Sequence, residues 1–231
     1  MSERKRSIKY IVLALILLVS GLVGAQETGE ENWGAWYMYF GTNQVSDKLS
    51  IHSEAQFRYF ETQGNFNQLL LRTGLNYHIN PDAIATLGYA YILTDNTFEE
   101  FEGDIDSKEH RIFQQFILKN KVGEFLFEHR YRLEQRFIDF GDFTDTQHRA
   151  RYRLQVTLPL TDTFFLNAYD EVFLNLQDDI FNQNRLYVAL GVHITENSSL
   201  QVGYLKNHFS RIDFDRLQVA LFFNPDLRKK K

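Results

Sequence analysis

The chain has 231 residues, 44% of them hydrophobic and 15% aromatic, which is enough for one domain with a sizeable core. A formal net charge of −5 argues against a general nucleic-acid binder, so no nucleic-acid partner is expected. Cysteine is absent, which excludes a disulfide framework and a thiolate metal site. The sequence has no phosphate-binding glycine loop, and no cofactor is predicted.

Residues 1–25 have the plan of a secretory signal peptide. A basic segment at Arg4–Arg6 precedes the apolar run Ile11–Val19, and small residues lead up to Ala25. The apolar run is short for a spanning helix, which needs about 20 residues, so an uncleaved membrane anchor is the less favoured alternative. We expect cleavage after Ala25 and a single domain over residues 26–231.

Alternation of apolar and polar side chains dominates the rest of the chain and predicts β-strands. Between residues 125 and 137, for example, aromatic and aliphatic side chains share one face, while Glu128, Arg130, Arg132 and Glu134 share the other. The candidate strands are 33–40, 49–60, 66–79, 84–94, 109–119, 124–137, 147–160, 163–175, 181–194, 198–208 and 214–224.

The length of these strands favours a membrane barrel over a soluble sandwich. A soluble strand usually has about 5–6 residues, whereas a strand that spans a membrane needs about 9–11. Short connections follow the third, fifth, seventh and ninth strands, and longer ones at 95–108 and 138–146 take alternate places. Short periplasmic turns and longer outer loops are typical of outer-membrane barrels. The predicted fold is therefore an all-β, antiparallel, transmembrane up-and-down barrel of 10 to 12 strands.

The strand count raises a difficulty, because the candidates number eleven and bacterial single-chain barrels usually have an even number. Either segment 33–40 lies outside the wall, which gives ten strands, or one further strand escapes notice, which gives twelve. Alternation alone also leaves open which face points inward. Export and strand length favour lipid outside and charge inside, and the reversed facing would make a soluble periplasmic lipid carrier.

Registers estimated from the midpoints of the connections pair the inward charges. They place Glu54 opposite Arg72. They also give a ladder of alternating sign across four neighbouring strands, made of Glu134, Arg151, Glu171 and Arg185. The predicted lumen charge network comprises Glu54, Arg72, Arg130, Arg132, Glu134, Arg151, Arg153, Glu171 and Arg185.

Two interpretations of these charges stay open. The predicted inward arginines are Arg58, Arg72, Arg111, Arg130, Arg132, Arg136, Arg149, Arg151, Arg153 and Arg185, and the inward acids are Glu54, Glu109, Glu128, Glu134 and Glu171. A charge in a narrow lumen needs a partner, so the network can fill and rigidify a closed barrel. The excess of arginine would favour anions if water fills the lumen.

Aromatic and acidic residues mark the expected edges of the barrel. Candidates for interfacial girdles include Trp33, Trp36, Tyr37, Tyr39, Phe222 and Phe223. Lipid of the outer membrane and the barrel-assembly machinery that inserts such proteins are the expected partners, and the specific ligand is unknown.

The acidic loop residues are Asp95, Glu99, Glu100, Glu102, Asp104, Asp106, Asp139, Asp142, Asp145, Asp178, Asp179 and Asp213. Charged loop residues of this kind usually serve solubility. The more specific hypothesis is that divalent cations bridge these carboxylates at the rim, and no metal site is assigned.

An enzymatic role is the alternative function. His208 lies two residues before Ser210 and near a connection, so these two are candidates for a barrel enzyme acting on lipid or envelope glycan. A nucleophile and base need spatial contact and an orienting third group, which the sequence does not show. We therefore predict no catalytic residues.

The segment His129–Phe137, followed by Arg149–Arg153, resembles strands of the bacterial outer-membrane family catalogued as domain of unknown function 2490. Other similar stretches are Trp33–Phe40, Lys48–Ser50, Gln68–Leu75, Gly88–Tyr91, Asp170–Phe173 and Gln183–Leu186. The resemblance covers about Trp33 to Phe223. The resemblance implies an outer-membrane barrel and supplies no catalytic residues. It also implies that the polar residues shared by the family include Glu134, Arg151, Glu171 and Arg185.

Overall fold

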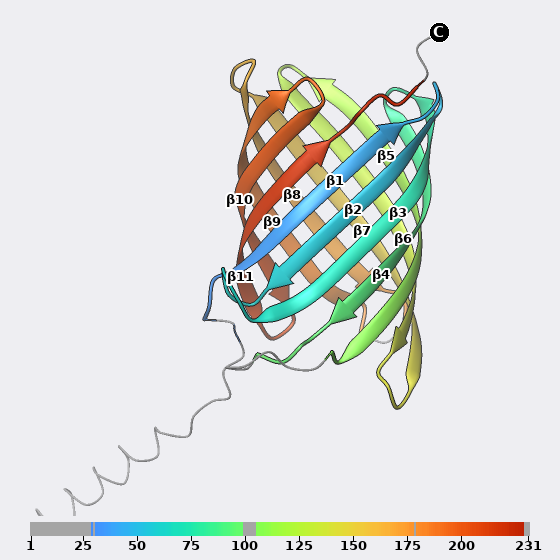
Figure 1. Cartoon of the computed structure of the whole chain (residues 1–231), viewed down its shortest axis with the longest axis vertical. Helices are drawn as coiled ribbons and strands as arrows, with labels where there is room; N and C mark the ends of the chain where they lie inside the picture. Colours follow the sequence, from blue (N-terminus) through green and yellow to red (C-terminus); the bar gives the residue numbers. More distant parts are fainter. Residues whose placement is uncertain (1–28, 30, 99–104, 178, 229–231) are drawn as a thin grey trace, which may run out of the picture.

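A computed structural model of the chain describes residues 29, 31–98, 105–177 and 179–228, and these form a closed β-barrel (Figure 1). The predicted signal peptide lies outside the described residues. The strands are β1 Gly34–Gln44, β2 Leu49–Tyr59, β3 Phe66–Asn80, β4 Ala83–Thr94, β5 Ser107–Val122, β6 Phe125–Asp139, β7 Thr144–Pro159, β8 Phe164–Asn175, β9 Phe181–Thr195, β10 Ser198–Phe209 and β11 Asp213–Phe223. Each corresponds to one predicted strand. Among the described residues, no helix is long and apolar enough to cross a membrane.

The barrel closes between its first and last strands, which run parallel to each other. Gly34 of β1 lies opposite Arg216 of β11, and the pairing continues to Gly41 opposite Phe223. All other neighbours are consecutive and antiparallel, so the barrel has eleven strands. This count lies within the predicted range of 10 to 12, whereas the preference for an even number, ten or twelve, is wrong. An odd number of hairpin-linked strands makes the first and last strands run parallel where the barrel closes. Their parallel ladder pairs the two edges that an open sheet would leave exposed. β1 and β11 lie side by side in Figure 1.

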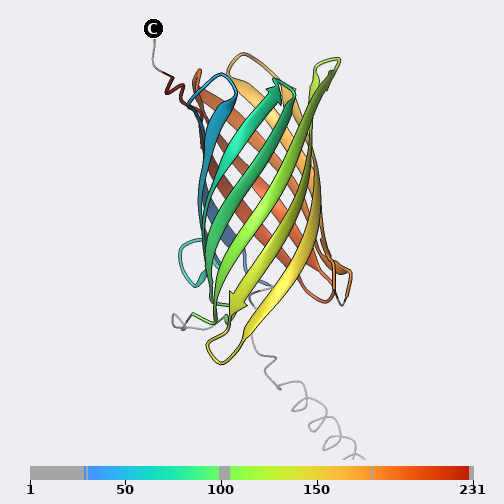
Figure 2. The same ribbon diagram turned by 90° about the vertical axis from the view of Figure 1, so that its right-hand side faces the viewer.

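Because the strand count is odd, the start of β1 and the end of β11 lie at opposite ends of the barrel. The connections at 45–48, 81–82, 123–124, 160–163 and 196–197 lie at one end, together with the end of β11. The other connections and the start of β1 lie at the opposite end, which we call the long-loop end. The β6–β7 hairpin projects beyond the wall there (Figures 1 and 2).

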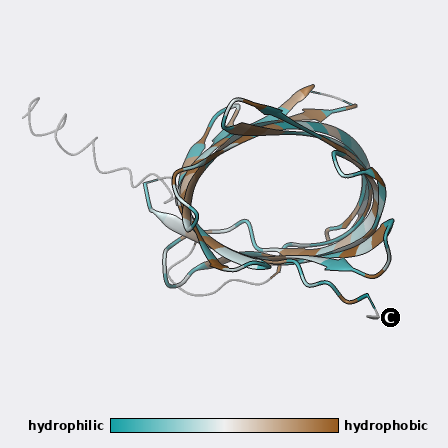
Figure 3. Cartoon of the chain, turned by 90° about the horizontal axis from the view of Figure 1, so that it is seen from above, coloured by the Kyte–Doolittle hydropathy of each residue, from teal (hydrophilic) through white to brown (hydrophobic). Residues whose placement is uncertain are grey.

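Polar side chains point into the barrel and apolar ones point out. Leu87, Leu186 and Val188 are more than half exposed on the outer face, at 60%, 56% and 52%. Glu134 and Glu171 are buried inside, with 1% and 3% of their surfaces exposed. Figure 3 shows the wall end-on, with hydrophobic and hydrophilic residues alternating along it. The reversed facing that a lipid carrier would need is therefore wrong.

Two of the predicted registers are correct. Glu54 on β2 lies opposite Arg72 on β3, and Glu171 on β8 lies opposite Arg185 on β9. Both pairs flank connections whose midpoints are close to the true centres of the hairpins.

The two registers that flank β7 are wrong by two residues. Glu134 lies opposite Arg149, and Glu171 lies opposite Arg153, so Arg151 takes neither predicted place. Both strands of the β6–β7 hairpin are longer than predicted, and Phe140 N donates to Phe143 O across a tight turn. The turn before β8 is longer by two residues than predicted, because β7 ends at Pro159 and β8 begins at Phe164. A shift of two residues leaves every side chain on its predicted face.

Glycines opposite phenylalanines make room for aromatic rings inside the barrel. Gly88 faces Phe113 across β4 and β5, and Gly191 faces Phe165 across β8 and β9. A Cβ atom added at Gly88 would lie 2.3 Å from the Phe113 ring, and one at Gly191 would lie 2.1 Å from the Phe165 ring. The rings therefore lie over the glycines, which leaves Phe113 fully buried among the inward charges.

Candidate lumen site

A cavity of about 1050 Å³ occupies the lumen. Its lining extends from His78 and Ser199 near the short turns to Phe60 and Phe98 near the long-loop end. Side chains therefore do not fill the barrel completely. Eleven arginines line the cavity: Arg58, Arg72, Arg111, Arg130, Arg132, Arg136, Arg149, Arg151, Arg153, Arg185 and Arg216. Arg216 was missed as an inward residue, although it alternates in step with Gln218 on the polar face of the last strand.

Glu134 is the centre of the charge network on β5, β6 and β7. Its carboxylate accepts hydrogen bonds from Arg149 at 2.7 and 2.9 Å and from Arg151 at 2.7 Å. Arg111 lies 3.5 Å away and Arg132 lies 3.7 Å away. Several cations thus share one buried anion, and this cluster is electrostatically positive even though each of its arginines has an acid within reach.

Glu171 links the same network to β8. It accepts from Arg130 at 2.7 Å and from Arg151 at 2.9 Å. Arg151 therefore bridges Glu134 and Glu171, as the predicted ladder requires, but by diagonal contacts because the register differs by two residues. Arg185 forms no ion pair within 4 Å with any described residue, so the last step of the predicted ladder is a register pairing without a contact.

Other acids also take arginine partners. Glu109 accepts from Arg111 at 2.6 Å and from Arg136 at 2.9 Å. Glu128 pairs with Arg153 at 2.6 Å. All five inward glutamates are thus neutralised by at least one arginine, which is what a charge removed from bulk water requires.

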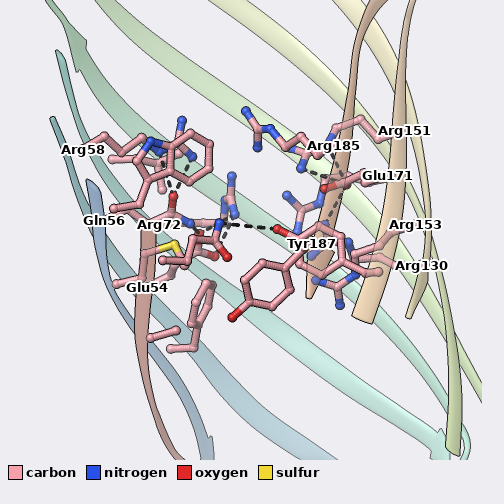
Figure 4. A pocket seen from close by; sticks show the side chains of 18 of the residues that line it. Glu54, Gln56, Arg58, Arg72, Arg130, Arg151, Arg153, Glu171, Arg185 and Tyr187 are labelled. Atoms are coloured by element: carbon pink, nitrogen blue, oxygen red, sulfur yellow. Dashed lines mark hydrogen bonds and ion pairs between the residues drawn. The ribbon is translucent and has the colours of Figure 1, made fainter. Parts of the chain in front are cut away.

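The opposite wall carries a smaller group on β2 and β3. Both Glu54 oxygens accept from Arg72 Nη1, at 2.8 and 2.7 Å. Glu54 also accepts from His52 at 3.0 Å and from Gln56. Gln56 in turn accepts from Arg58 at 3.0 and 2.5 Å, so the amide connects the ion pair to a second arginine. Figure 4 shows this group facing Arg151, Glu171 and Arg185 across the lumen, with Tyr187 between them.

Three arginines that line the cavity have no acid within 4 Å among the described residues. Arg58 donates to Gln56 and, at 2.6 Å, to Gln68. Arg185 donates to Asn207 at 3.4 Å. Among the described residues, Arg216 donates to two backbone carbonyls, at 3.1 and 3.4 Å. Within the described part of the chain none of the three has a carboxylate within 4 Å, so their charges are not compensated locally.

Aromatic rings inside the barrel contact these guanidinium groups. Arg58 and Arg185 lie over the Trp36 ring, with 3.9 and 4.8 Å from each Cζ to the ring centroid. Such contacts partly stabilise a cation that lacks an anion. Trp36 is 4% exposed and points inward, so its assignment to an interfacial girdle is wrong. Its position in β1 places it in step with Met38 and Phe40, which also line the cavity.

The predicted network residues mostly meet in one cavity. Eight of the nine line it, and Glu134 lies buried behind its arginines. The sequence reasoning missed the neutral and aromatic members of the site, above all Trp36, Gln56, Tyr187 and Asn207. The alternation of these four residues with lipid-facing neighbours is the sequence signal that could have identified them as inward-facing.

The candidates outside the lumen form no comparable site. His208 Nδ1 donates a hydrogen bond to the carboxylate of Asp213, and no hydrogen bond among the described residues joins His208 to Ser210. The described residues also contain no group of three or more histidines or acids that could hold a metal ion. Part of the acidic loop, from Glu99 to Asp104, and Asp178 lie outside the described residues.

The fold and lumen define a closed β-barrel with a polar interior, and comparison with known proteins places the chain in a family. The model of the family described as "protein of unknown function (DUF2490)" matches residues 33–218, so the chain belongs to that family. An uncharacterized protein of Methylorubrum extorquens is 26% identical over 236 residues, covering 94% of this chain and 98% of that one. The solved structure of the NanC porin aligns with a TM-score of 0.53 and 10% identity, over 82% of this chain and 97% of that one.

Proposed function

We propose that this protein is exported to the outer membrane and forms a narrow channel that prefers anions. The N-terminal sequence supports export, and strands of 11 to 16 residues with an apolar outer face are suited to crossing a bilayer. The barrel-assembly machinery is the partner we expect during insertion. The fold that the chain shares with a porin is compatible with passage of solutes through the barrel.

The observation that carries the proposal is the charge of the cavity wall. Eleven arginines line the lumen, whereas the inward acids are five glutamates that are all paired. A ring of fixed positive charge lowers the energy of an anion in a pore and raises that of a cation. The low-dielectric wall focuses this field along the lumen.

A closed barrel of structural role is the second candidate, and one feature favours it. Phe60 contacts Phe98 and Phe214 at the long-loop end, with ring centroids 5.9 and 6.3 Å apart. Phe214 in turn contacts Phe209. This aromatic cluster lines one mouth of the cavity and would close it if the rings met across the opening.

Single-channel recording of the refolded protein in a planar bilayer with a KCl gradient separates the two candidates. A shift in gel mobility on heating first shows that the barrel is folded. We expect steady current steps. We also expect a zero-current potential whose sign shows that chloride permeates more readily than potassium. A folded barrel without current would contradict the channel and favour the structural role. A cation-selective current would contradict the assignment of selectivity to the arginines.

A further inference from the structure

One sector of the lumen wall holds positive charge without an acid and buried donors without an acceptor. The sector is formed by Trp36 on β1, Arg58 on β2, and Arg185 and Tyr187 on β9. We refer to these four residues as the donor sector. In Figure 4, Arg58 lies on one side of the lumen and Arg185 lies on the other, beside Arg151 and Glu171. Arg185 is the register neighbour of Glu171, and its guanidinium also lies 4.6 Å from the Phe173 ring.

Two side chains of the donor sector have unused hydrogen-bond donors. The indole Nε1 of Trp36 and the hydroxyl of Tyr187 are buried and have no hydrogen-bond partner within the described structure. The two residues are only 4% and 3% exposed and belong to one packed cluster. Buried donors in native proteins almost always have an acceptor, so two orphans in one cluster require an explanation.

The two arginines of the sector supply charge in the same place. The Trp36 ring brings Arg58 and Arg185 together, because both guanidinium groups contact it. Among the described residues, Arg185 donates only through Nε, to Asn207, which leaves its terminal nitrogens unengaged. A guanidinium fork of this kind matches the two oxygens of a carboxylate or phosphate group.

We propose that the donor sector is an oxyanion-binding site, at which Arg185 holds the carboxylate or phosphate group of a small solute. Trp36 Nε1 and the Tyr187 hydroxyl donate further hydrogen bonds to the oxyanion, and Arg58 adds its charge. A spherical halide can neutralise the charge but cannot accept the same set of directed hydrogen bonds. The inference deepens the proposed function, since solutes would reach the site through the anion-preferring lumen.

The fluorescence of Trp36 provides a direct test. The chain has two tryptophans, so Trp33→Phe leaves Trp36 as the only one. This variant, folded in detergent micelles, is titrated with sodium acetate and with sodium phosphate at constant ionic strength set by NaCl. We expect a saturable change in emission. Saturation with acetate alone identifies a carboxylate site, with phosphate alone a phosphate site, and with both a general oxyanion site.

Second variants locate the binding. In the Trp33→Phe background, Arg185→Gln should weaken binding by about tenfold or more, the usual effect of losing a charged hydrogen bond. Tyr187→Phe removes only the hydroxyl and preserves the packing, so a several-fold loss there does not depend on misfolding. Arg211→Gln, in the connection before β11, is the control and should leave the affinity unchanged.

The outcomes separate this inference from the channel itself. Saturable binding in a folded barrel that conducts no current would overturn the channel and leave the site intact. Anion-selective current without saturable binding of either oxyanion would overturn the site and leave the channel intact. Binding that Arg185→Gln and Tyr187→Phe do not weaken would also overturn the site.

Discussion

Glu134 is the residue on which the arrangement of the lumen arginines depends most. It is almost fully buried, yet it accepts hydrogen bonds from Arg149 and Arg151 and lies within 4 Å of Arg111 and Arg132. Replacing a pair of opposite charges by apolar groups can be neutral, whereas removing one partner leaves the other charge without compensation. Loss of this one carboxylate would leave several guanidinium groups to repel one another.

We therefore predict that Glu134→Gln lowers the free energy of unfolding by about 3 kcal/mol, which is typical of breaking a buried pair. Equilibrium unfolding in urea, with the protein refolded into lipid vesicles, measures the change. Glu124→Gln is a matched control, because Glu124 is exposed in the turn between β5 and β6. An equal effect of the two substitutions would show that the arginines do not depend on Glu134.

The packing of phenylalanine over glycine is a second feature at this scale. Gly88 leaves space for Phe113, whose ring also lies 4.9 Å from the Arg132 guanidinium and 5.3 Å from that of Arg72. The ring thus separates two arginines that belong to different ion pairs.

Gly88→Val should force this ring away and cost about 2 kcal/mol of stability, as overpacking usually does. The double variant Gly88→Val with Phe113→Ala should recover part of the loss, because the clash is removed with the ring. Unfolding free energies of the single and double variants give the coupling between the two positions. Purely additive effects would contradict the contact.

At the scale of the strands, the sequence predicted where each element lies and which side chains share a face, whereas the inward direction of the polar face was inferred from export and strand length. Alternation carried this information, since the period of two is a local property of each strand. It could not reveal the parallel closure, because Gly34 and Arg216 are far apart in sequence and no hairpin connects them. Two registers slipped by two residues because the turns near Phe140 and Phe164 could not be measured from composition.

The site was predictable in its charges and less so in its contacts. Inward arginines and glutamates follow from parity, but which of them pair depends on diagonal reach across strands, as in Arg151 between Glu134 and Glu171. Trp36 was misplaced because an aromatic residue near a strand end is typical of a membrane interface. Only the fold shows that Arg58 and Arg185 converge on it.

At the scale of the whole molecule, the odd number of strands places the start of β1 and the end of β11 at opposite ends of the barrel. If the short turns face the periplasm, the long-loop end and the start of β1 face the cell exterior. The seam continues past the last strand, where Gln44 N donates to Pro225 O at 3.0 Å and Leu227 N donates to Gln44 O at 2.8 Å.

Epitope insertions test this orientation. An epitope placed at Gly141, in the turn between β6 and β7, should bind antibody on intact cells. One placed at Gly123, in the turn between β5 and β6, should bind only after the outer membrane is permeabilised. Both glycines have positive φ and no atom within 4 Å of an added Cβ, so these turns are open to insertion. The reverse labelling pattern would mean that the barrel is inserted the other way.

The central claim is that lumen arginines without an acid partner make the barrel prefer anions. The most direct test is the zero-current potential across a planar bilayer under a KCl gradient, compared between the wild type and Arg58→Gln/Arg185→Gln/Arg216→Gln. The control is Arg228→Gln, beyond β11, where the guanidinium pairs with Asp47 and Asp226 outside the lumen. We predict an anion-selective potential for the wild type and the control, and a potential much closer to zero for the triple variant. Equal potentials in all three proteins would contradict the claim.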